Sequence, residues 1–166
     1  MAVLDAVLNY EFESLYYADD WGSQNGFIMG SEIWRAFIRP CLKKIFSKAK
    51  SKGKYIIVHS CGDNRDILSD FIDIGIDCYN TVQPEIYDLA WLKREYSRDL
   101  SFLWCNQQPA VFTICSCDGG KRALPSCLNI MSGNGGYILS PTHNITPDIP
   151  IENAFAIIEA AREFGG

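Results

Sequence analysis

His59 and Cys61 stand one residue apart, directly after the apolar run Tyr55-Ile56-Ile57-Val58. This run follows a Lys/Gly-rich turn and predicts a buried strand, so the two polar residues fall where the strand ends. Residues i and i+2 of an extended segment share a side, so the imidazole and the thiolate can meet at one point while Ser60 faces away. Such a pair suits zinc. Alternatively, Cys61 is a small buried apolar residue and His59 a hydrogen-bonded strand end, because a metal site needs further ligands.

Other polar residues also follow expected strands. Asp19 and Asp20 come after the run 14–18, which we expect to form a buried strand, together with a tryptophan and Gln24. Adjacent acids can orient a ligand, fix a metal-bound histidine or cap the next helix. A cap accounts for one acid but not for this whole group, so we treat the group as a candidate site. Asn80 is the last residue of the expected strand 76–80, Gln83 lies at the exit of that strand, and His143 follows the expected strand 136–140.

The chain alternates between strand and helix patterns. We expect a helix over 31–46 with one apolar face (Ile33, Trp34, Phe37, Ile38, Leu42, Ile45 and Phe46) and a kink at Pro40. The other expected helices are 3–12, 66–74, 86–96 and 152–164, and the expected strands are 14–18, 55–58, 76–80, 100–104 and 136–140. These make about five strand-helix units of a parallel sheet or (β/α) barrel. A complete eight-unit barrel needs ~250 residues, so we expect the chain to form part of one.

Composition limits the class of protein. With 166 residues and 48% hydrophobic residues, the chain is expected to form a single domain over 1–166. A net charge of -5 without a basic cluster argues against nucleic acid as a partner. No apolar run approaches the ~18 residues of a membrane span, and no signal peptide is apparent, which predicts a cytoplasmic protein without a membrane partner. The seven cysteines are an odd number and favour reduced thiols over a disulfide framework.

Five strings together resemble, in order and spacing, the C-terminal part of the uroporphyrinogen decarboxylase family. The resemblance is greatest to its uncharacterised and corrinoid-linked methyltransferase-type branch. It rests on Asp19-Asp20-Trp21-Gly22-Ser23-Gln24, His59-Ser60-Cys61-Gly62-Asp63, Asn80 with Gln83-Pro84-Glu85, Gly135 to His143, and Pro150-Ile151-Glu152-Asn153. It implies an α/β fold, the C-terminal part of a TIM (β/α)8 barrel with its active site at the C-terminal ends of the strands.

The resemblance also implies a zinc site. The methyltransferase branch holds zinc with a His-x-Cys pair, matched by His59 and Cys61, and a late cysteine, whose place is taken here by His143. The zinc activates a thiol acceptor such as coenzyme M, with a corrinoid as co-substrate and a corrinoid protein as a possible partner. We assign Asp19 and Asp20 to orienting or catalytic roles, and Gln24, Asn80 and Gln83 to binding the cofactor, and we expect a small-molecule substrate.

Two other functions stay open. The first is metal-free decarboxylation of uroporphyrinogen in porphyrin biosynthesis, in which Asp20 and His143 would position the substrate. The family's N-terminal Arg-rich segment and early aspartate are absent, and Met1 precedes what would be a mid-barrel helix, so we expect a truncated gene. The second is an inactive fragment that associates with itself through exposed barrel edges.

The segment 104–126 fits no part of the pattern. It carries Cys105, Cys115 and Cys117 without clear periodicity, where relatives read Gly-Gly-Ile-Ser-Thr-Gln followed by a Leu-Pro turn. Codons for Trp104 to Val111, read one nucleotide later, can spell Gly-Ala-Ile-Ser-Asn-Gln-Gln. We therefore expect a compensated pair of frameshifts, with an ordinary divergent loop as the alternative, and do not assign Cys115 or Cys117 as metal ligands.

Overall fold

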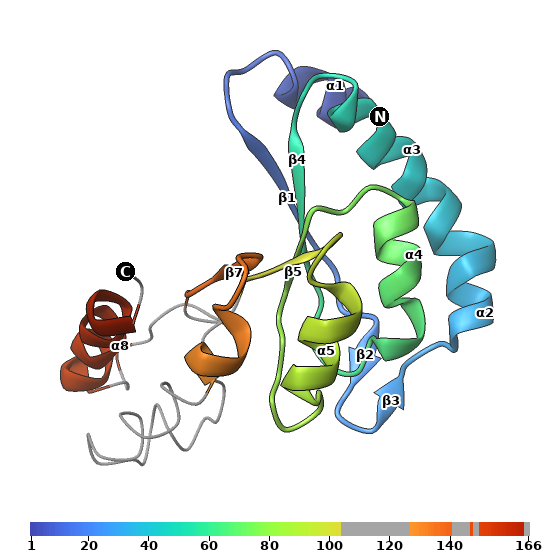
Figure 1. Ribbon diagram of the computed structural model, residues 1–166. Helices are drawn as coiled ribbons and strands as arrows, with labels where there is room; N and C mark the ends of the chain where they lie inside the picture. Colours follow the sequence, from blue (N-terminus) through green and yellow to red (C-terminus); the bar gives the residue numbers. More distant parts are fainter. Residues whose placement is uncertain (104–126, 141–146, 148–149, 165–166) are drawn as a thin grey trace. The chain divides into compact units, whose positions relative to one another are not determined.

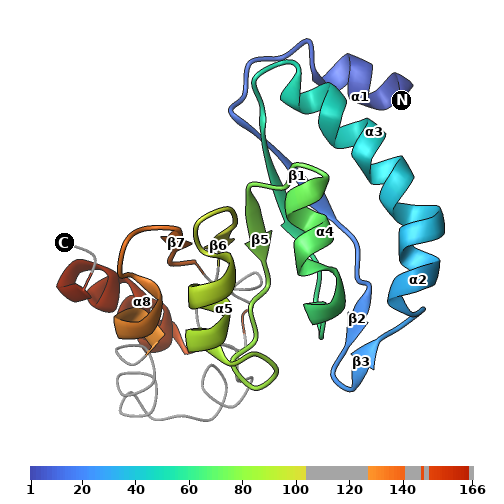
Figure 2. The ribbon, with the colours of Figure 1, turned by 45° about the vertical axis from the view of Figure 1, so that its right-hand side comes forward.

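The computed structural model describes residues 1–103, 127–140, 147 and 150–164. Strands and helices alternate along the chain, as Figures 1 and 2 show. The chain divides into two compact units, residues 1–81 and 82–166. His143 and the whole of 104–126 lie outside the described residues. The frameshift hypothesis therefore stays a prediction.

Three parallel strands form the sheet of the first unit. β1 (Ser14–Ala18) pairs with β4 (Tyr55–His59), and β4 pairs with β5 (Cys78–Asn80). The register aligns the last residues of the three strands, Ala18, His59 and Asn80. The C-terminal ends therefore lie at one edge of the sheet. These strands confirm the expected segments, although β5 begins two residues later than predicted.

Helices of the first unit cover one face of these strands. One continuous helical segment consists of α2 (Ser31–Ile33), the π-helical turn η1 (Trp34–Ile38) and α3 (Arg39–Lys50). A second one consists of the 3-10 turn η2 (Arg65–Ile67) followed by α4 (Leu68–Asp73). Both views place α3 and α4 on the same side of β1 and β4 (Figures 1 and 2). Large aromatic side chains pack against one another between these helices and the strands: Tyr17, Trp21, Trp34, Phe46, Phe71 and Tyr79. This packing holds the strands that carry the site.

The apolar face expected for 31–46 is only partly correct. Trp34, Leu42 and Phe46 are buried, but Ile33 and Phe37 are exposed, Phe37 by 71%. In a regular α-helix the eight-residue step from Trp34 to Leu42 would place their side chains about 80° apart. The π-helical turn rotates less per residue and brings both side chains onto the same face. This turn lies just before Pro40, the residue expected to kink the helix.

Two other expectations need correction, and one element was missed. The helix expected over 3–12 is α1 (Ala2–Val7), which ends earlier and leaves its valines exposed. β1 is not a buried strand, since Tyr16 is 54% exposed; the helices pack against the opposite face, where Tyr17 contacts Phe46. The antiparallel hairpin of β2 (Gly22–Ser23) and β3 (Gly26–Phe27) was not predicted, because two-residue strands leave no periodic pattern.

The second unit also contains parallel strands. α5 (Leu89–Tyr96) is capped at its N-terminus by Asp88, whose carboxylate accepts a hydrogen bond from the backbone N–H of Trp91 at 3.1 Å. β6 (Ser101–Leu103) pairs with β7 (Tyr137–Ile138), residues 127–131 are helical, and α8 (Ile151–Phe164) follows. Lys93 donates from α5 to the carbonyls of Met131 and Gly135. In the described part of the chain, no helix has the length and apolar character needed to span a bilayer.

Candidate functional site

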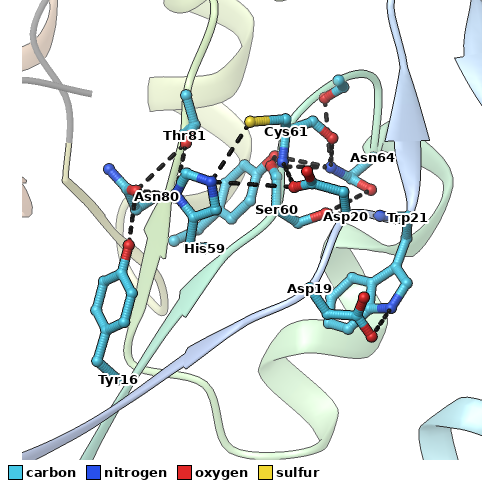
Figure 3. Close-up of polar contacts among 12 residues, drawn as sticks. Tyr16, Asp19, Asp20, Trp21, His59, Ser60, Cys61, Asn64, Asn80 and Thr81 are labelled. Carbon is cyan, nitrogen blue, oxygen red and sulfur yellow. Dashed lines mark hydrogen bonds and ion pairs between the residues drawn. The ribbon is translucent and has the colours of Figure 1, made fainter. Parts of the chain in front are cut away.

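The aligned strand ends bring Asp20, His59 and Cys61 together (Figure 3). Nε2 of His59 lies 3.4 Å from Sγ of Cys61 and 3.9 Å from Oδ1 of Asp20. The backbone N–H of Cys61 donates to the same Asp20 oxygen at 2.8 Å. One ligand atom from each residue lies within 4.8 Å of the others. The arrangement therefore offers a nitrogen, a sulfur and an oxygen to a single point.

The other ring nitrogen of His59 is held from β5. Nδ1 contacts Oδ1 of Asn80 at 2.5 Å and Oγ1 of Thr81 at 2.9 Å. Tyr16 donates its hydroxyl to the same Asn80 oxygen at 3.3 Å. An amide oxygen can only accept, so this contact requires the proton on Nδ1 and directs the Nε2 lone pair toward Cys61 and Asp20. The imidazole is thereby held in the tautomer that a metal ligand needs.

The loop that follows β4 is fixed by buried hydrogen bonds. Ser60 faces away from the cluster, and its Oγ accepts a hydrogen bond from the backbone N–H of Trp21 at 3.1 Å. The side-chain amide of Asn64 donates to the carbonyls of Ser60 and Cys61 at 3.2 and 3.1 Å. The hydroxyl of Tyr79 also donates to the Ser60 carbonyl, at 2.9 Å. These bonds fix the direction in which Cys61 leaves the strand.

Gly22 and Gly62 allow the backbone of the loop that carries Asp20 to contact the backbone of the loop that carries Cys61. A Cβ on Gly62 would lie 2.3 Å from the carbonyl carbon of Gly22, and a Cβ on Gly22 would lie 2.6 Å from the backbone nitrogen of Asp63. Gly62 also has a φ of 77°, in the left-handed region. Between the two loops, the N–H of Asp63 donates to the carbonyl of Ser23 at 2.9 Å. The spacing between Asp20 and Cys61 therefore depends on backbone contact.

The surroundings favour the neutral form of Cys61. Burial raises the pKa of its thiol, and the negative charge of Asp20 raises it further, while a hydrogen bond with Thr81 acts in the opposite direction. A divalent cation held by the same three residues would reverse this balance, because its charge stabilises the thiolate.

The remaining sequence-predicted residues lie elsewhere. Asp19 turns away from the cluster and accepts a hydrogen bond from Nε1 of Trp21 at 3.1 Å (Figure 3). Gln24 is exposed in the turn between β2 and β3. Gln83 belongs to the second unit, where it donates to Glu85 at 3.2 Å. His143 lies outside the described residues, so its role as a ligand stays a prediction.

Three residues of the site were not found from the sequence. Thr81 and Tyr16 contact the His59–Asn80 pair, and Asn64 holds the loop. Thr81 directly follows an expected strand end, which is a usable signal for a site residue. Tyr16 and Asn64 give no such signal, since a strand tyrosine and a loop asparagine are common without a function.

The fold and the site together define an α/β protein whose polar side chains cluster at the C-terminal edge of parallel strands. The family model described as Uroporphyrinogen decarboxylase (URO-D) matches residues 1–164. The chain therefore belongs to the uroporphyrinogen decarboxylase family. A search of curated proteins gave no match.

Proposed function

We propose that this chain forms the C-terminal part of a (β/α)8 barrel that carries out zinc-dependent methyl transfer from a corrinoid or methylated donor to a thiol such as coenzyme M. The observation that carries the proposal is the 3.4 Å approach of His59 Nε2 to Cys61 Sγ. Two adjacent ligands of a tetrahedral zinc ion are separated by about this distance. A corrinoid protein would be the partner that delivers the methyl group.

The residues present fit zinc. Imidazole nitrogen, thiolate sulfur and carboxylate oxygen are its usual ligands, and the contact of His59 with Asn80 is the second hydrogen bond that zinc-binding histidines typically make. A bound zinc ion would lower the pKa of an incoming thiol, so that a thiolate exists at neutral pH. Asn80 and Thr81 would hold the imidazole, and Cys61 would supply the sulfur. We propose His143 as a further ligand, and Gln24 and Gln83 as residues that bind the cofactor.

A second candidate is decarboxylation of uroporphyrinogen. It is favoured by Asp20, whose side chain is 58% exposed at the edge of the sheet and can accept hydrogen bonds from pyrrole N–H groups. In this case the cluster would act without metal. The two functions therefore differ in metal content.

The test is metal analysis of the full chain combined with two assays. After zinc loading and dialysis, we expect about one zinc ion per chain and transfer of a methyl group from methylcobalamin to coenzyme M. Cys61→Ser should lose both, since a hydroxyl is a poor replacement for thiolate. Cys41→Ser, which changes an exposed thiol of α3, is the matched control and should keep both. A zinc-free protein that releases carbon dioxide from uroporphyrinogen would support the second candidate instead.

A further inference from the structure

We infer that Asp20 binds the metal ion directly, so that Asp20, His59 and Cys61 form a three-ligand site contained within the first unit. The inference rests on the proposed zinc-dependent function and extends it. The sequence alone assigned Asp20 an orienting or catalytic role.

The two distances from Nε2 of His59, to Cys61 Sγ and to Asp20 Oδ1, are compatible with direct ligation. Ligand atoms 2.0–2.3 Å from a tetrahedral zinc ion lie roughly 3.3–3.7 Å from one another. The nitrogen-sulfur distance of 3.4 Å is within this range, and the nitrogen-oxygen distance of 3.9 Å needs a shift of only a few tenths of an ångström. Asp20 can make this shift at low cost because its side chain is largely exposed. The Cys61 N–H, which donates to the same oxygen, keeps the carboxylate on the correct side.

Other residues already orient the His59 imidazole, so Asp20 is not needed for that role. A residue that orients His59 must contact Nδ1, and that nitrogen contacts Asn80 and Thr81. Asp20 instead approaches Nε2, the nitrogen that a metal would bind. The neighbouring Asp19 accepts from the Trp21 indole and points elsewhere (Figure 3). Of the two adjacent acids, only Asp20 has the geometry of a ligand.

The charges also balance. A carboxylate and a thiolate together neutralise a divalent cation, and the imidazole binds as a neutral ligand. Three ligands from one unit leave a fourth tetrahedral position for water or a thiol substrate, which is the arrangement of catalytic zinc sites. This set does not depend on His143. His143 would either take the fourth position or expand the coordination number.

Counting sulfur ligands tests the inference. X-ray absorption of the zinc-loaded full chain should show about one sulfur per zinc for the unmodified protein. Asp20→Cys should raise this number to about two, because a thiolate placed at a ligand position binds zinc. Asp19→Cys is the matched control, one residue away, and should stay at about one. If the Asp20→Cys variant binds zinc with only one sulfur ligand, the inference is overturned, whereas the proposed function is unaffected.

A second variant covers a failure of Asp20→Cys to fold. Asp20→Asn keeps an oxygen that can accept from the Cys61 N–H but removes the charge. We expect zinc affinity to fall by more than ~100-fold, beyond the ~10–100-fold typical of an orienting residue. Urea unfolding without metal should match that of the unmodified chain. A loss of less than ~10-fold would overturn the inference. An unmodified chain that binds no zinc would overturn both the inference and the zinc-dependent function.

Discussion

His59 and Asn80 face each other across two parallel strands, paired in register, with Nδ1 of the imidazole against the amide oxygen. The strand pairing itself sets this contact, and Tyr16 supports it from a third strand. The tautomer of the histidine is thus determined by the backbone register of the sheet.

Replacing Asn80 should remove the preference of His59 for the tautomer with its proton on Nδ1. Asn80→Leu keeps the approximate size of the side chain but removes the acceptor, so we expect zinc affinity to fall by ~10–100-fold. The ¹⁵N chemical shifts of the His59 ring should change toward a mixture of tautomers, and with two histidines in the chain the signals can be assigned. Asn25→Ala, in the exposed hairpin turn, is the control. An unchanged tautomer in Asn80→Leu would contradict the assigned role of the amide.

Gly62→Ala should destabilise the first unit by about 2–4 kcal/mol, because it combines a left-handed φ with a Cβ pressed against Gly22. Gly53→Ala is the matched control: Gly53 has a φ of 72°, but its Cβ would meet no atom within 4 Å. It should cost only about 1 kcal/mol. Urea unfolding monitored by tryptophan fluorescence measures both. Equal losses would show that the contact between the glycines adds nothing.

Asp70 should contribute more to stability than Asp73. Asp70 is 10% exposed and pairs with Nε of Arg35 at 2.8 Å and Nε of Arg39 at 3.0 Å. Its replacement by asparagine should cost about 2–3 kcal/mol, because two guanidinium groups lose a largely buried partner. Asp73→Asn removes an ion pair of a 65% exposed carboxylate and should cost less than about 1 kcal/mol. The free energies of unfolding in urea should differ in this order.

Cys78 should make the protein less stable at alkaline pH. Burial, with a smaller effect of the Asp77 charge, raises the pKa of its thiol to about 12. In the unfolded chain the thiol ionises near pH 8.5, so the unfolded state loses the proton first as the pH rises. The stabilisation is complete below about pH 8.5 and falls by about 1.4 kcal/mol per pH unit until about pH 12.

The comparison of Cys78→Ala with Cys41→Ala tests this effect. We expect the slope of unfolding free energy between pH 8 and 10 to become smaller in Cys78→Ala. Cys41 is exposed on α3, so Cys41→Ala should keep the original slope. Identical slopes in all three proteins would rule out Cys78 as the cause.

The features that could be predicted from the sequence are those that a short periodic pattern encodes. The run before His59 ends in the polar pair, and the structure places the imidazole and the thiol of that pair on one side, as expected from the two-residue repeat of a strand. The contacts of His59 with Thr81 and of Gly62 with Gly22 depend on strand register and backbone approach, which no local pattern specifies. The sequence assigned Asp19 and Asp20 the same roles in the proposed zinc site, but the fold separates them: Asp19 accepts a hydrogen bond from the Trp21 indole, whereas Asp20 approaches Nε2 of His59.

The π-helical turn over Trp34–Ile38 has a further consequence for the length of the long helical segment. A turn closed by i→i+5 bonds holds about one residue more than an α-helical turn. Removing a single residue such as Ala36 should convert the segment to regular α-helix, with Trp34 and Leu42 still on the buried face. The same deletion inside α3 would rotate Phe46 and Ala49 away from the strands. The helix therefore contains one position at which a shorter chain is compatible with the same core.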